Sequence, residues 1–190
     1  PNSAFSFHHY CMTTAIFADL SFGCDWNADA VLGFAMDYAQ EHNIPALLSE
    51  FGATNNISTI TTGMNSANRH LIGWTEWAYT GNDPTSTSPI DQALVYDLTK
   101  PPVGDNVNVD KLDALSQPYP QLISGVPTSW SFNDGVFTFS YSTDHADGSG
   151  AFAAGSQTTI SVPTSQYPNG YTVSVTGGHV TSGPNATQLI

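Results

Sequence analysis

The sequence predicts two structural classes in one chain of 190 residues: an α/β part with parallel strands, then an antiparallel all-β part. Short apolar or aromatic runs alternate with helix-like segments in the first part, which is the pattern of parallel strands with right-handed crossovers. These runs end in polar rings or carboxylates, as strands do where an α/β barrel keeps its chemistry. After Pro118 the pattern changes to short alternating strands bounded by Gly and Pro.

The first strand is predicted at residues 5–11, with the sequence FSFHHYC. Period-two alternation places Ser6, His8 and Tyr10 on one face, and we expect this polar face to point toward the functional end of the sheet. A core histidine that bonds to the backbone is the alternative interpretation of His8.

A helix is predicted at residues 26–43. Asn27 is a good N-cap, and Trp26 is spaced to form a hydrophobic staple with Val31. An apolar stripe at helical spacing is expected to cover a sheet; it consists of Val31, Phe34, Ala35, Tyr38 and Ala39. Pro45 ends the helical pattern.

The second strand is predicted at residues 44–50 and ends in Glu50, with Gly52 turning the chain just afterwards. Alternation places Glu50 on the same face as Ala46 and Leu48. A carboxylate at the end of a buried parallel strand indicates a catalytic position. The alternative is a charge that merely ends the strand and meets solvent.

A weaker helix is predicted at residues 55–70, and a third strand follows at 71–79. In this strand Trp77 shares a face with Thr75, whereas Glu76 lies on the opposite face with Trp74. A polar loop at 81–89, a short helix to about residue 98 and a last helical segment at 110–116 complete the first part.

The second part begins with a predicted hairpin, in which strands at 129–132 and 136–142 are joined by Asn133-Asp-Gly135 in a type I′ turn. Further strands are predicted at 158–162 and 171–176, and residues 188–190 resemble the start of another. Residues 144–150 are acidic and rich in glycine. A solvated loop is expected there, and a calcium loop is the alternative.

The charge of the chain is unusual, because three basic residues stand against sixteen acidic ones and give a net charge of −13. Such a surface repels phosphate backbones, so nucleic-acid binding is excluded as a function. The low lysine content and the few charges overall favour a secreted or cell-surface protein.

Cys11 and Cys24 are the only cysteines and lie thirteen residues apart. In an exported protein this spacing favours a disulfide, with two buried thiols as the alternative. A metal site is disfavoured, because no Cys-x-x-Cys pair is present and adjacent His8 and His9 point to opposite faces of a strand. No cofactor motif is found in the sequence.

Three motifs of the first part carry a resemblance to a known family: FSFHHYC, SEFGATN and GWTEWAY. In this order and spacing they resemble the last three strands of the glycoside hydrolase family 5 barrel. Within that family, they are most similar to the endoglycoceramidase group. The segments LVYD at 94–97, KPPVGDN at 100–106, PYP at 118–120 and GVPTSW at 125–130 resemble that group's link into its C-terminal domain. The resemblance implies that residues 1–118 are the C-terminal part of a (β/α)8 TIM barrel. It implies an antiparallel β-sandwich at 119–190, a span that is short for a complete sandwich.

The resemblance also implies a site. Glu50 would be the nucleophile of a retaining β-glycosidase, Tyr10 would orient it, and Trp77 would lie under the sugar beside the cleaved bond. His8 and Glu76 are further candidates for substrate binding, although a structural role is the alternative for Glu76. The mechanism needs no metal or cofactor.

The family's acid/base is a glutamate that follows an asparagine at the end of the fourth strand. None of Glu41, Glu50 and Glu76 follows an asparagine. A complete barrel takes about 250 residues, and this chain begins at Pro1 without methionine. We therefore expect the acid/base on a missing N-terminal half of the barrel, on a second chain cut from the same precursor.

The expected function is hydrolysis of a β-glycosidic bond between a glycan and a lipid or other hydrophobic aglycone. A β-1,4-glucanase-like member of the same family is one alternative. The other is a non-catalytic carbohydrate-binding or cell-surface module, which would use the same aromatic side chains without the second carboxylate.

Overall fold

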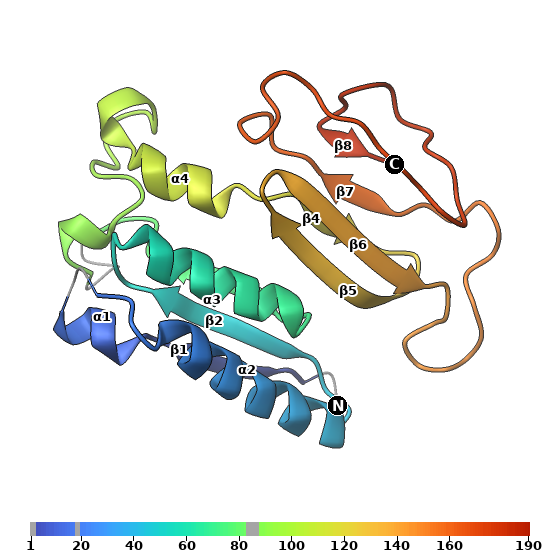
Figure 1. The fold of residues 1–190 in the computed structure, drawn as a ribbon, viewed down its shortest axis with the longest axis horizontal. Coiled ribbons are helices and arrows are strands. Elements are labelled where there is room, and N and C mark those ends of the chain that lie inside the picture. The colour runs from blue at the N-terminus through green and yellow to red at the C-terminus, as the bar shows by residue number, and fades with distance from the viewer. Residues whose placement is uncertain (1–2, 18–19, 83–87) are drawn as a thin grey trace. The chain divides into compact units, whose positions relative to one another are not determined.

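The structure is a computed structural model that describes residues 3–17, 20–82 and 88–190. The chain divides into two compact units, Pro1–Leu115 and Ser116–Ile190. The first unit holds a parallel sheet with its helices, and the second holds antiparallel strands (Figure 1).

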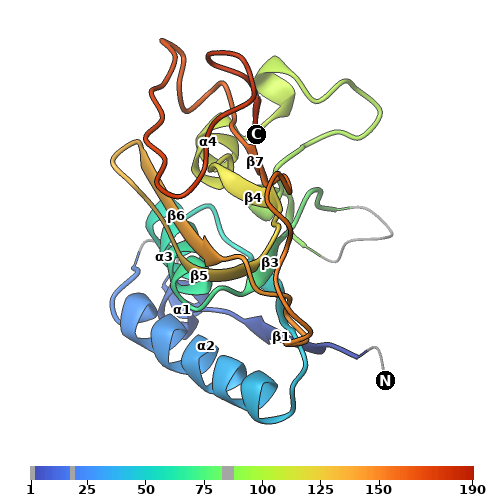
Figure 2. The same cartoon turned by 90° about the vertical axis from the view of Figure 1, so that its right-hand side faces the viewer.

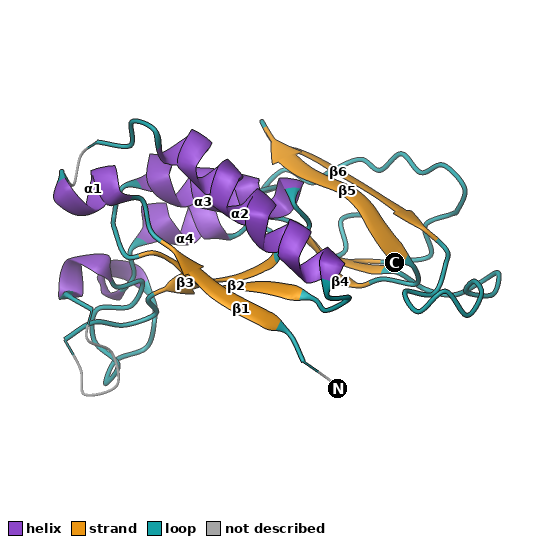
Figure 3. Cartoon of the chain, turned by 90° about the horizontal axis from the view of Figure 1, so that it is seen from below, coloured by secondary structure: helices purple, strands orange, loops and turns teal. Residues whose placement is uncertain are grey.

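The first unit is built on three parallel strands in the order β1-β2-β3: β1 (Phe5–His9), β2 (Ala46–Gly52) and β3 (Gly73–Trp77). The prediction of three parallel strands is confirmed. Helices α2 (Cys24–Glu41) and α3 (Ile57–Arg69) connect them and cover one face of the sheet (Figure 3). The core lies between these helices and the sheet, and consists of Leu32, Leu48, Phe51, Ile60, Met64, Ala67 and Ile72.

Helix α2 differs from the prediction at its start. It begins at Cys24, and its N-cap is Gly23, which has φ 76° and makes no side-chain capping bond. Asn27 is therefore not the cap; its Oδ1 lies 2.8 Å from Nε2 of His9. Trp26 is 77% exposed and forms no staple. The expected cap was wrong because a left-handed glycine turns the chain into the helix one residue before Cys24.

The buried face of α2 also differs from the predicted stripe. Ala35 and Ala39 are buried as expected, but Leu32 and Ala28 complete the row, while Phe34 and Tyr38 lie exposed. The small alanines bring the helix close to the sheet, so the larger rings one position away are turned outward. Tyr38 instead packs against Phe5, with the ring centroids 4.8 Å apart.

Helix α3 follows the prediction closely. Its N-cap is Asn56, whose side chain accepts a hydrogen bond from the Thr59 amide at 3.0 Å. Gly63 lowers the helix propensity, but a Cβ there would lie only 2.8 Å from Cδ2 of Phe51. The glycine therefore allows the helix to approach β2 at the level of the functional residues.

A short helix that the sequence analysis did not predict, α1 (Met12–Ile16), follows β1. The Cys11–Cys24 disulfide joins the two ends of this connection, so the predicted pairing is confirmed. Closing a loop of this size stabilises the folded state by roughly 3 kcal/mol.

The predicted helix from residue 89 to about 98 is wrong. Only a 3-10 turn, η1 (Ile90–Gln92), forms; Val95 then makes an antiparallel bridge with Val107. The Asn106 amide donates to the carbonyls of Asp97 and Pro101 at 2.9 and 3.0 Å, which replaces helical bonding in this stretch. A second turn, η2 (Gly104–Asn106), leads to α4 (Val109–Leu115), near the predicted 110–116. Residues 83–87 of the predicted loop lie outside the described residues.

The second unit contains two antiparallel sheets. β5 (Val126–Asn133) and β6 (Val136–Ser142) form the predicted hairpin and run side by side (Figures 1 and 2). Asp134 and Gly135 have φ values of 49° and 76°, as a type I′ turn requires. The other sheet has the order β4-β7-β8, formed by β4 (Tyr119–Leu122), β7 (Thr159–Ser161) and β8 (Gln188–Leu189).

Two segments of the second unit, at 171–176 and 144–150, are held by side-chain hydrogen bonds. The strand predicted at 171–176 does not form, because the Tyr171 amide donates to the Asn185 side chain at 2.8 Å instead of to a neighbouring strand. The loop at 144–150 is organised by Ser149, which bonds His145 and Asp147. Among the described residues, no group of three or more His, Cys, Asp or Glu side chains is arranged to hold a metal ion.

None of the described helices combines the length and the apolar character needed to cross a membrane.

Candidate active site

Glu50 lies at the carboxyl end of β2, where the ends of the three parallel strands meet. Two side chains of the preceding strand segment contact its carboxylate. The Tyr10 hydroxyl donates to Glu50 Oε2 at 2.6 Å, and Nδ1 of His8 lies 3.2 Å from the same oxygen. Glu50 is 27% exposed and His8 51% exposed, so the group is open to solvent on one side. This exposure rules out the interpretation of His8 as a core histidine.

The side of the sheet that Glu50 occupies differs from the prediction. Leu48 and Phe51 both lie in the core, although strict alternation would place them on opposite faces. The register of β2 shifts against both neighbours in this region. Such an irregularity redirects the side chains beyond it. Glu50 is therefore separated from the face of Leu48 and joins His8 and Tyr10.

Tyr10 is a hydrogen-bond donor whose protonation state is well protected. Its burial raises the pKa of the phenol, and the hydrogen bond to the negatively charged Glu50 raises it further. The phenol therefore keeps its proton throughout the neutral range. A donor at 2.6 Å from a carboxylate oxygen of Glu50 holds this side chain in one rotamer.

The open face of the sheet is lined by hydroxyl groups near this site. The Ser6 and Ser49 hydroxyls lie 2.7 Å apart, and the Thr75 hydroxyl donates to the Ser49 carbonyl at 2.6 Å. No helix covers this face in the described part of the first unit (Figure 3). Within the described part of the first unit, the site thus lies at the end of a sheet that carries helices on one face only.

Trp77 ends β3 and pairs in register with Gly52, two positions beyond Glu50. It is half-buried, and Thr75 and Gly73 on the same face are exposed, as alternation predicts. Trp74 lies on the other face and packs edge-on against Phe51. The peptide bond between Trp77 and Ala78 is cis.

Glu76 forms a buried ion pair, which favours the structural one of its two candidate roles. Its side chain is only 6% exposed and its Oε1 lies 3.1 Å from Nζ of Lys111, which is fully buried. Burial raises the pKa of Glu76, and the Lys111 ammonium acts in the opposite direction. Lys111 also donates to the Gln92 carbonyl, so it ties α4 and η1 to the end of β3.

Sequence reasoning did not single out Lys111 as a member of this region. The one available signal was its rarity, because the chain has only three basic residues. The remaining glutamate, Glu41, is the last residue of α2 and so lies at the amino end of β2, away from Glu50. Of the three glutamates, only Glu50 is therefore open to solvent at the carboxyl end of the sheet.

Two family models match the sequence: the cellulase model of glycosyl hydrolase family 5 over residues 1–83, and the glycoside hydrolase family 5 C-terminal domain over residues 117–190. No curated protein sequence matched. The chain resembles the solved structure of endo-glycoceramidase II from Rhodococcus sp., a lactosyl-enzyme intermediate, with a TM-score of 0.64 and 22% identity.

That likeness shows a shared fold and covers 98% of this chain but only 38% of the Rhodococcus chain, so the protein described here spans well under half of its neighbour's length. The two matched models describe the two parts of one family's architecture, in the same order as the two units. The chain belongs to glycoside hydrolase family 5.

Proposed function

We propose that this chain is the C-terminal part of a retaining β-glycosidase of the endoglycoceramidase type, which cleaves the bond between a glycan and a lipid or other hydrophobic aglycone. The observation that carries the proposal is the Glu50 carboxylate at the strand ends, held by the Tyr10 hydroxyl at 2.6 Å. A nucleophilic carboxylate needs to be oriented and accessible, and the hydrogen bond from Tyr10 and the partial exposure of Glu50 meet these two needs.

The chemistry is a double displacement. Glu50 attacks the anomeric carbon while the glycosidic bond breaks, and an acid group protonates the departing oxygen. The same group then takes a proton from water, which attacks the anomeric carbon and releases Glu50. We assign the acid/base role to a glutamate of the missing N-terminal half. His8 and Trp77 are proposed to contact the sugar, since an exposed imidazole and a half-buried indole flank Glu50 in the strand register.

The open sheet supports the proposal of a missing half. Parallel sheets are buried on both faces in known folds, and no helix in the described part of the first unit covers the hydroxyl-lined face. Among the described strands, β1 and β3 each pair with a neighbour on one side only. We propose that residues 1–118 complete a TIM barrel with the preceding half on a second chain from the same precursor. Residues 119–190 would form the β-sandwich domain. The Cys11–Cys24 disulfide supports a secreted or cell-surface location.

The first test is the stereochemical outcome of hydrolysis by the complete enzyme, meaning this chain together with its N-terminal half. Proton NMR of the earliest product of a β-glycoside should show the β-anomer, because two inversions restore the configuration. An α-anomer as the first product would overturn the assignment of Glu50 as a nucleophile. Intact-mass analysis of the native protein should also reveal the second polypeptide.

Tyr10→Phe isolates the contribution of the hydroxyl. A hydrogen bond to a charged group contributes about 1.5–3 kcal/mol, so we expect kcat/KM to fall about 10- to 100-fold while the ring still fills its space. Most of the loss should appear in kcat, because the hydroxyl orients the nucleophile while the ring keeps its place. An unchanged kcat/KM would show that Tyr10 does not position the nucleophile.

The cellulase description of the matching family model favours one alternative, a β-1,4-glucanase-like activity. Parallel assays with a glycolipid and a soluble β-1,4-glucan separate the two. Preference for the glucan would replace the lipid aglycone in the proposal and leave the role of Glu50 unchanged.

A further inference from the structure

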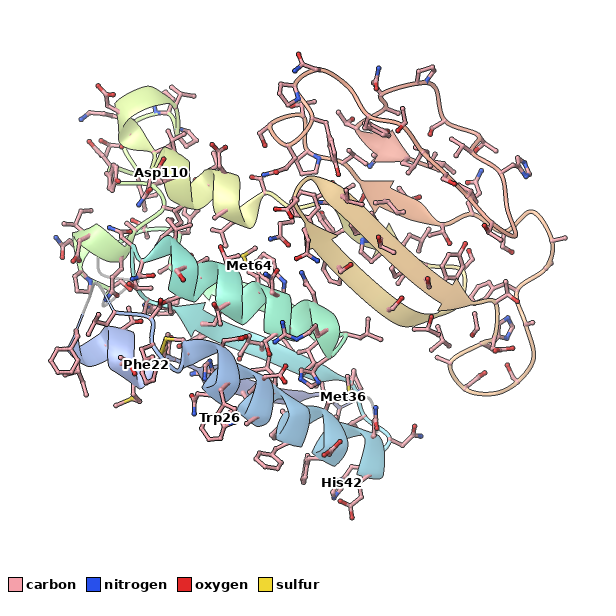
Figure 4. All side chains as sticks on the ribbon, viewed as in Figure 1. Phe22, Trp26, Met36, His42, Met64 and Asp110 are labelled. Atoms are coloured by element: carbon pink, nitrogen blue, oxygen red, sulfur yellow. A yellow bond between two sulfur atoms is a disulfide. The ribbon has the colours of Figure 1, made fainter. Side chains whose placement is uncertain are left out.

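An exposed apolar surface lies beside the proposed site, on the connection between β1 and α2 and on the first turn of α2. We call it the apolar rim, and its side chains are all more than half exposed: Met12, Ile16, Phe17, Leu20, Phe22 and Trp26. Phe22 is 86% and Trp26 77% exposed, and Figure 4 shows the Trp26 ring pointing away from α2. Isolated exposed apolar residues need no explanation, but six within residues 12–26 indicate an interaction surface.

The described parts of the connection are anchored to the rest of the first unit at several points. The disulfide joins its ends, with the Cα atoms of Cys11 and Cys24 5.3 Å apart. The buried Thr14 hydroxyl donates to the Leu20 carbonyl at 2.7 Å and lies 2.7 Å from the Thr59 hydroxyl. Thr14 therefore faces inward on α1, while Met12 and Ile16 face outward. The exposure of the apolar side chains is thus built into the local fold.

The position of the rim separates it from the surfaces that neighbouring barrel units would cover. Figure 1 shows α1 directly after the carboxyl end of β1. Met12 follows Tyr10 by two residues, so the rim adjoins the strand ends. Units of an α/β barrel join through strand edges and outer helices, whereas the loops after the strands surround the mouth. The preceding unit would therefore pair with β1 and pack on α2, so it would lie nearest to Trp26 on that helix. The five rim residues that precede α2 would stay exposed.

The charge of the chain selects among apolar partners. Residues 11–26 contain no Lys or Arg, and the chain carries a net charge of −13, so anionic headgroups are repelled. We propose that the rim inserts into the interface of a neutral, zwitterionic lipid assembly and brings lipid-linked glycosides to Glu50. The delivery of glycosides to Glu50 rests on the proposed function, whereas binding of the rim to lipid can be measured independently of it.

The test is flotation of the complete enzyme with phosphatidylcholine vesicles. The wild type should float with the vesicles, and Phe17→Ser combined with Phe22→Ser should lower the partition coefficient about tenfold or more, because two large apolar side chains no longer enter the interface. Val136→Ser is the matched control, since Val136 is 64% exposed on the hairpin of the second unit, and it should bind like the wild type. Adding phosphatidylserine should weaken binding at low salt.

Binding that fails in the wild type, persists in the double variant, or grows with anionic lipid would overturn the inference. A wild-type oligomer that the double variant converts to a smaller species would assign the rim to protein association instead. A kinetic readout separates this inference from the proposed function: the double variant should hydrolyse a soluble aryl glycoside at the wild-type rate and a vesicle-borne glycolipid more slowly. If no glycoside is hydrolysed at all, the proposed function fails and the flotation result still decides the inference.

Discussion

Glu50→Gln should lower the turnover of the complete enzyme about 10⁴-fold or more, because a neutral amide oxygen is a poor nucleophile toward the anomeric carbon. Glutamine has nearly the same shape, and it can still accept the Tyr10 hydrogen bond that measures 2.6 Å in the wild type. The fold should therefore survive. The measurement is kcat on an aryl β-glycoside, with circular dichroism as the check of folding.

Glu41→Gln is the matched control, because Glu41 ends α2 at the opposite end of the sheet and should change kcat less than about twofold. A second variant, Glu50→Ala, distinguishes a nucleophile from an acid/base. Azide can occupy the vacated space and attack the anomeric carbon once, which gives the α-glycosyl azide; a variant of the acid/base would give the β-azide. Wild-type turnover in Glu50→Gln, or a β-azide from Glu50→Ala, would contradict the assignment.

The parallel sheet could be predicted because its determinants are local. Each strand is a short apolar run bounded by Gly, Pro or polar residues, and the intervening helices carry apolar residues at helical spacing. Helix α1 could not be predicted in this way. It has five residues, two of them threonine, and is held by the disulfide and by Thr14 bonding to Leu20 and Thr59. Those partners are distant in sequence or outside the helix, so propensity alone does not reveal them.

The sequence indicated which strand ends carry the candidate site, but it did not predict the face on which Glu50 lies or the partner of Glu76. Glu50 and Tyr10 were both expected at strand ends, and the structure brings their side chains together. Alternation placed Glu50 on the face of Leu48, and this was wrong because a period of two cannot register the irregularity between Leu48 and Phe51. The partner of Glu76 was also hidden, since Lys111 lies 35 residues further along the chain.

Lys111→Met should destabilise the complete protein by about 3–5 kcal/mol, the usual cost of leaving one member of a buried ion pair without its partner. Both side chains are nearly inaccessible, at 0% for Lys111 and 6% for Glu76. Lys100→Met is the matched control, because the Lys100–Asp97 pair has a shorter separation of 2.8 Å but Lys100 is 69% exposed. Solvent screens that exposed pair, so Lys100→Met should change the free energy of unfolding far less than Lys111→Met does. Urea unfolding of both variants measures the difference in the free energy of unfolding.

The cost of Lys111→Met in the free energy of unfolding should depend on pH in a definite direction. Burial raises the pKa of Glu76, so the folded state holds this proton more tightly than the unfolded state does. The corresponding stability is present below the unfolded pKa and is lost as the pH rises through the folded one. Without the opposing ammonium the folded pKa rises further, so Lys111→Met should be least harmful in acid and most harmful above that pKa. Adding Glu76→Leu should restore much of the loss, because the uncompensated charge disappears. A cost below about 1 kcal/mol that does not vary with pH would mean that the Glu76 carboxylate is hydrated despite its position, and that the pair does not hold α4 to the end of β3.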